Sequence, residues 1–112
     1  MTVCQLEYER ARRALDQFCA RRNARTSGRV ARLICRQDGE ELLIGEVRER
    51  RNFAGGKGFR ALVRLSYQDE RWRLFWPLQG GDWQPYPHLR HAGTIRAVIE
   101  ELEQAPLHVH WG

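Results

Sequence analysis

The segment from Phe59 to Leu78 constrains the fold most strongly, because apolar and polar residues alternate on both sides of one turn. A two-residue loop at Asp69 and Glu70 creates one apolar face by pairing Tyr67 with Trp72, Leu65 with Leu74 and Val63 with Trp76. The other face is mostly polar, with Ser66 opposite Arg73 and Arg64 opposite Phe75. A half-buried sheet requires this division. Pro77 cannot donate to the ladder, so the ladder is expected to end, or to bulge, just before Pro77.

A second hairpin is predicted upstream at Asp38-Gly39, because both residues accept the positive φ angles of a type I′ turn. Pairing outward from this turn gives apolar pairs on both faces: Cys35 with Leu42 and Leu33 with Ile44 on one, Ile34 with Leu43 and Val30 with Val47 on the other. Near the turn we therefore expect either a sheet covered on both sides or a side that meets a second subunit. The charged residues from Glu46 onward predict a solvated far end.

Two helices flank these hairpins. Apolar residues recur every three or four positions from Val3 to about Arg22, which predicts an amphipathic helix. Thr94 is a good N-cap for a second helix that stops before Pro106. Its buried stripe consists of Ile95, Val98, Ile99 and Leu102.

The remaining segments predict two short strands. A tight turn at Gly80-Gly81 places Trp83 opposite Leu78, and the tail from Leu107 to Trp111 alternates as a last strand does. The predicted fold is α+β: an antiparallel β-meander of four to five strands with the N-terminal and C-terminal helices packed on one face. Residues 1–112 are expected to form a single domain.

The cysteines and the hydropathy pattern predict a cytoplasmic protein. Cys4, Cys19 and Cys35 are odd in number and lack the spacing of a zinc knuckle or a redox motif, so we expect reduced and mostly buried thiols. No apolar run approaches the length needed to cross a bilayer, and we expect no membrane partner. Glu7 and Glu9 interrupt the region where a signal peptide would be apolar.

Arginine-rich segments are the strongest functional signal. The formal net charge is +5, and one acid-free run holds Arg21, Arg22, Arg25, Arg29, Arg32 and Arg36. In addition, Arg64, Arg73 and Phe75 share the outer face of the central hairpin. Arginine interleaved with an exposed aromatic residue on a sheet holds phosphates and stacks bases, so these residues are the candidate nucleic-acid interface. The alternative is a solvated face whose arginines reflect a G/C-rich genome, since Lys57 is the only lysine among 19 basic residues.

Histidines supply a second candidate site. All four lie in the last quarter of the chain, at His88, His91, His108 and His110. His108 and His110 would share one face of a strand, a spacing that can present two imidazoles to one metal ion. The alternative is a set of surface imidazoles. The glycine-rich loop around Lys57 lacks the P-loop pattern, and no nucleophile motif is present, so we expect no catalytic residues and no cofactor.

The order of these features resembles a small bacterial family catalogued as a domain of unknown function. The resemblance rests on Leu15, Phe18 and Cys19 followed by arginines, on the strand with Trp72, Leu74, Phe75 and Trp76, on Trp83 and Tyr86 three apart, and on the closing Trp111-Gly112. It implies a compact α+β domain and no activity, so it assigns no functional residues. His108 and His110 depart from the ending typical of the family.

Together these observations predict a non-enzymatic interaction module whose favoured ligand is nucleic acid, bound through an arginine-rich surface. One alternative is a protein partner or self-association as a homodimer. The other is a metal-dependent enzyme that uses the C-terminal histidine cluster.

Overall fold

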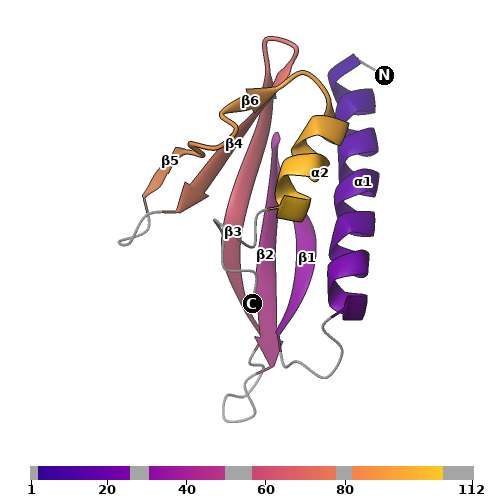
Figure 1. The fold of residues 1–112 in the computed structure, drawn as a ribbon, viewed down its shortest axis with the longest axis vertical. Helices are drawn as coiled ribbons and strands as arrows, with labels where there is room; N and C mark the ends of the chain where they lie inside the picture. Colours follow the sequence, from indigo (N-terminus) through magenta and orange to yellow (C-terminus); the bar gives the residue numbers. More distant parts are fainter. Residues whose placement is uncertain (1–2, 26–30, 50–56, 78–81, 105–112) are drawn as a thin grey trace.

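The computed structural model describes residues 3–25, 31–49, 57–77 and 82–104. The elements are, in order, α1 (Val3–Arg25), β1 (Ala31–Asp38), β2 (Glu41–Glu49), β3 (Lys57–Gln68), β4 (Arg71–Pro77), β5 (Trp83–Pro85), β6 (His91–Ala92) and α2 (Ile95–Gln104). Both helices lie on the same side of one antiparallel sheet, which confirms the predicted α+β class (Figure 1). The sheet therefore has an inner face under the helices and an outer face. Among the described residues, no helix is long and apolar enough to cross a membrane.

The described sheet has six strands, one more than the upper limit of the prediction, in the order β1-β2-β3-β4-β5. The sixth, β6, also pairs with β4, so β5 and β6 follow one another along β4. Between them the Leu74 N–H donates to the Arg90 carbonyl oxygen (3.1 Å), and the Leu74 carbonyl accepts from the Tyr86 N–H (3.0 Å). The chain thus leaves the edge of β4 after Tyr86 and returns to it at Arg90.

The central hairpin has the predicted register. Asp69 and Glu70 have φ angles of 52° and 60°, the left-handed conformation that a type I′ turn requires at both positions. The pairs Tyr67–Trp72, Ser66–Arg73, Leu65–Leu74 and Arg64–Phe75 all form. The β3–β4 ladder ends at Arg64–Phe75, so the predicted pair of Val63 with Trp76 is not part of it.

The β4–β5 register also differs from the prediction, because Trp83 lies opposite Pro77 instead of Leu78. A shift of one residue exchanges the two faces of a strand. The observed register places the Tyr86 side chain on the inner side, where it is fully buried. Burial of this large ring accounts for the choice of register. The Gly80-Gly81 turn and the predicted last strand from Leu107 to Trp111 lie outside the described residues.

The first hairpin turns one residue later than predicted, at Gly39-Glu40, and pairs Cys35 with Ile44. Gly39 has a φ of 61°, and neither Asp38 nor Glu40 has a positive φ. This pattern fits a type II′ turn, which needs a single positive φ at its first central position and so favours glycine there. Each residue of β1 therefore pairs with a β2 residue two positions later than predicted. A shift of two residues leaves every side chain on its predicted face.

The far end of this hairpin is not simply solvated, because Glu46 is buried with only 3% of its surface exposed. Its Oε1 lies 3.3 Å from the Arg60 Nε, across the β2–β3 ladder. A bulge after Ile44 makes this pairing possible: Ile44 lies opposite Val63 but Gly45 lies opposite Ala61, which leaves Leu62 as the extra residue. The bulge therefore reverses the facing of residues 59–61.

One hydrophobic core joins the inner face of the sheet to both helices. Fully buried members include Leu15 and Phe18 of α1, Leu65, Trp72 and Leu74 of the central hairpin, and Val98 and Leu102 of α2. Thr94 is the N-cap of α2, as predicted, because its Oγ1 accepts a hydrogen bond from the Ala97 N–H (3.2 Å). Ile95 and Ile99 complete the predicted stripe as partly buried residues.

Asn23 joins the end of α1 to the outer edge of β1, where the described part of the sheet ends. Its Nδ2 donates to the Leu33 carbonyl (2.9 Å), and its Oδ1 accepts from the Leu33 N–H (2.8 Å). The side chain therefore replaces a neighbouring strand for one residue of an edge strand.

Replacing Asn23 with alanine is expected to lower the free energy of unfolding by about 1–3 kcal/mol, because both backbone groups of Leu33 lose a partner. Asn23→Asp keeps the acceptor for the Leu33 N–H but places a carboxylate oxygen against the Leu33 carbonyl oxygen, so it is expected to be destabilising as well. Urea unfolding followed by far-UV circular dichroism measures both. Equal stability of Asn23→Ala and the unmodified protein would show that water replaces the contact without cost.

Candidate nucleic-acid interface

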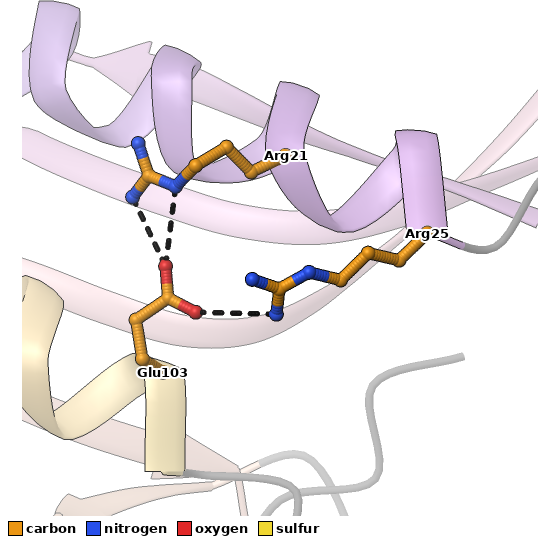
Figure 2. A network of polar contacts seen from close by, with 3 residues as sticks. All are labelled: Arg21, Arg25 and Glu103. Atoms are coloured by element: carbon orange, nitrogen blue, oxygen red, sulfur yellow. Dashed lines mark hydrogen bonds and ion pairs between the residues drawn. The ribbon is translucent and has the colours of Figure 1, made fainter.

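The structure divides the predicted arginine run between the two layers of the molecule. Arg21 and Arg25 project from α1 and converge on Glu103 of α2 (Figure 2). The Arg21 Nη2 and Nε lie 3.0 and 3.3 Å from Glu103 Oε1, and the Arg25 Nη1 lies 3.7 Å from Oε2. These two arginines therefore link the helices.

The rest of the run does not form one cluster either. Arg22 is half-buried on α1, and Arg29 lies outside the described residues. Arg32 and Arg36 lie on β1, at positions that alternate with the buried Leu33 and Cys35. Both side chains are therefore on the outer face of the sheet, and both residues are exposed.

Arg64 and Phe75 form the centre of the outer face. The Arg64 guanidinium carbon lies 4.7 Å from the centroid of the Phe75 ring and 5.3 Å from that of Trp83. Its Nε is also 2.8 Å from Glu41 Oε2. Arg64 is thus stacked with two aromatic rings and held by a carboxylate, an arrangement that fixes the plane of the guanidinium.

A similar stack lies towards the β1 edge, where the Arg36 guanidinium carbon is 4.7 Å from the centroid of the Phe59 ring. Phe59 reaches the outer face because of the bulge in β3, and its ring lies over Gly45. Arg73, the last predicted member, pairs with Asp69 at 3.1 Å and keeps 46% of its side chain exposed. The outer face therefore combines arginine–aromatic stacks at Arg36–Phe59 and Arg64–Phe75–Trp83.

Phe59 and Trp83 were not predicted as members of this face. The face of Trp83 follows from its pairing partner on β4. The sequence could have indicated the outer face only with the correct β4–β5 register. For Phe59, strict alternation from Arg64 points the side chain inward, and no residue pattern announces the bulge that reverses it.

The two described histidines of the predicted metal set have different surroundings. The His88 ring packs edge-on against Trp76 and Tyr86, at centroid distances of 5.9 and 5.4 Å. His91 lies opposite Arg73 on the outer side of β6. His108 and His110 fall outside the described residues. Within the described ranges, no group of three or more potential metal ligands is present.

Cys19 and Cys35 are free and buried, as predicted, whereas the side chain of Cys4 is outside the description. Burial raises the pKa of Cys19 to about 12 and that of Cys35 to about 11. Both thiols are therefore protonated at neutral pH. A nucleophilic cysteine requires the thiolate, so neither residue has the character of a catalytic group.

The fold and this surface define an α+β protein whose antiparallel sheet carries two helices on one face and arginine–aromatic stacks on the other. The chain belongs to the family described as "Domain of unknown function (DUF3024)", which matches residues 3–112. This match confirms the family resemblance seen in the sequence. No curated protein and no solved structure matches the chain.

Proposed function

We propose that this protein binds single-stranded nucleic acid on the outer face of its sheet. The observation that carries the proposal is the pair of stacks formed by Arg36 with Phe59 and by Arg64 with Phe75 and Trp83. Aromatic rings and guanidinium planes both stack on unpaired bases, and arginine also binds phosphate. Bases inside a duplex do not offer their faces, so the expected ligand is a single strand.

The distribution of paired and unpaired charge supports the same face. In the helix layer, Arg21 and Arg25 share one carboxylate partner, Glu103. On the outer face, Glu41 holds Arg64, but within the described ranges Arg32 and Arg36 form no ion pair. These two arginines are the groups best placed to contact phosphates.

Binding is tested by fluorescence anisotropy with labelled single-stranded and duplex oligonucleotides. We expect the single strand to bind more tightly, with an affinity that falls roughly tenfold or more between about 50 and about 200 mM salt if three phosphates are contacted. Arg32→Gln combined with Arg36→Gln is expected to weaken binding and to reduce the salt dependence.

The matched control, called the helix-layer variant, combines Arg13→Gln with Arg96→Gln. It removes the same charge from exposed positions on α1 and α2. Equal effects of the two variants would show that only net charge matters and would reject the outer face as the site. Absence of binding at about 50 mM salt would reject the function itself. Sedimentation would then test the same face for self-association.

A further inference from the structure

A groove of about 400 Å³ lies along the edge of β4, where β5 and β6 meet it. Its basic lining comes from three places: Arg71 and Arg73 on β4, Arg90 at the return of the chain, and His91 on β6. Phe75 and Pro85 form its apolar end. Only Arg73, Phe75 and His91 were candidate residues in the sequence, and His91 was a candidate for metal binding.

The backbone holds these residues in place. The hydrogen bond from Leu74 N–H to the Arg90 carbonyl fixes one wall, and the pairing of Arg73 with His91 fixes the adjoining one. The Tyr86 hydroxyl donates to Glu101 of α2 (2.8 Å). This hydrogen bond connects the start of the segment between β5 and β6 to the helix layer. The backbone positions that carry the four basic side chains are therefore fixed relative to one another, and all four residues are exposed.

Most of the positive charge of the groove has no acidic partner among the described residues. No acidic residue lines it, and within the described residues Arg71, Arg90 and His91 form no ion pair. Arg73 alone has a carboxylate partner, Asp69, which is 84% exposed. A second hollow, lined by Arg64 and Arg73, also contains Glu40 and Glu41 and is therefore less suited to an anion.

We propose that this groove binds the phosphate group of a nucleotide, with the attached nucleoside against Phe75 and Pro85. Several guanidinium groups that converge from separate segments match the multiple oxygens of a phosphate. The apolar end suits a ring, and the volume lies within the usual range for a small-molecule site. The identification of the ligand as a nucleotide rests on the proposed function, whereas the anion site rests on the groove.

The test is isothermal titration of the protein with adenosine 5′-monophosphate, adenosine and inorganic phosphate. We expect the monophosphate to bind about tenfold or more tightly than either part, because phosphate and nucleoside contacts combine. Arg71→Gln combined with Arg90→Gln is expected to weaken binding of the monophosphate about tenfold or more. The helix-layer variant, with the same net charge, is expected to bind like the unmodified protein.

Oligonucleotides with and without a 5′-phosphate then identify the source of the phosphate. Tighter binding of the phosphorylated strand, lost in the Arg71→Gln/Arg90→Gln protein, assigns the groove to a terminal phosphate. Equal binding of both strands, with the same loss in the variant, assigns it to an internal phosphodiester.

Two results separate this inference from the proposed function. If strands bind but the groove variant leaves both strand and monophosphate binding unchanged, the groove is rejected and the outer face stands. If the monophosphate binds through Arg71 and Arg90 but no strand binds, the strand-binding function is rejected and the groove stands as a mononucleotide site. If the monophosphate binds no more tightly than adenosine, the phosphate site is overturned.

Discussion

Replacing Trp72 with alanine is expected to lower the free energy of unfolding by about 3–5 kcal/mol, as large-to-small changes of core aromatic residues do. Trp72 is fully buried, and its ring centroid lies 5.2 Å from that of Tyr8 and 4.9 Å from that of Tyr67. Tyr8 also accepts a hydrogen bond from the Tyr67 N–H (3.1 Å) and donates to the Glu40 carbonyl. Trp72 therefore joins α1 to the central hairpin.

Trp72→Phe is the matched comparison. The Trp72 Nε1 is buried and finds no hydrogen-bond partner within the described part of the chain. Phenylalanine removes this unsatisfied donor, which offsets part of the packing loss, so we expect less than half the effect of alanine. Urea unfolding followed by circular dichroism measures both variants. A loss below about 1 kcal/mol for Trp72→Ala would contradict the central place of this ring in the core.

The central hairpin was predictable because two independent signals agree there. The alternation of side chains and the two-residue loop at Asp69-Glu70 specify the same register, and the structure has it. In the first hairpin the signals allow two answers. A turn at Asp38-Gly39 and a turn at Gly39-Glu40 give registers that differ by two residues, so each side chain lies on the same face in both. Hydrophobic alternation therefore cannot choose between the two turns.

The bulge near Leu62 and the arrangement of the arginines could not be predicted from the sequence, for a different reason. Both depend on partners distant in the chain. Arg21 and Arg25 form part of an acid-free run, yet both pair with Glu103 of α2. Local composition therefore overestimated the candidate interface along α1, while strict alternation missed Phe59, which the bulge turns outward. Prediction of the site requires the tertiary pairing that the core imposes.

Gly45 lies where this pairing matters most, next to the bulge. A Cβ built there would be 2.4 Å from the backbone oxygen of Arg60 and 2.6 Å from the Phe59 ring. A ring can move aside, but a carbonyl oxygen in the β2–β3 ladder moves only with its strand. The residue is therefore glycine because the two strands and the aromatic ring approach it too closely for a side chain.

Gly45→Ala is expected to lower the free energy of unfolding by about 3 kcal/mol, at the upper end of the cost of overpacking. The substitution displaces the Phe59 ring that Arg36 covers, so binding of single-stranded nucleic acid is expected to weaken as well. Gly58→Ala is the control in the neighbouring strand, where a Cβ meets nothing within 4 Å and the φ angle is not positive. We expect it to change stability by less than about 0.5 kcal/mol.

Comparison of stability and binding separates the two roles of Gly45. One outcome is that Gly45→Ala reduces both the urea midpoint and the affinity for single-stranded nucleic acid, while Gly58→Ala changes neither. The close approach at Gly45 then supports the fold and positions Phe59 for the nucleic acid. If stability falls but the folded protein keeps its affinity for nucleic acid, Phe59 does not contact the nucleic acid, and base stacking is confined to the Arg64–Phe75–Trp83 stack. A Gly45→Ala protein as stable as the unmodified one would contradict the bulge geometry itself.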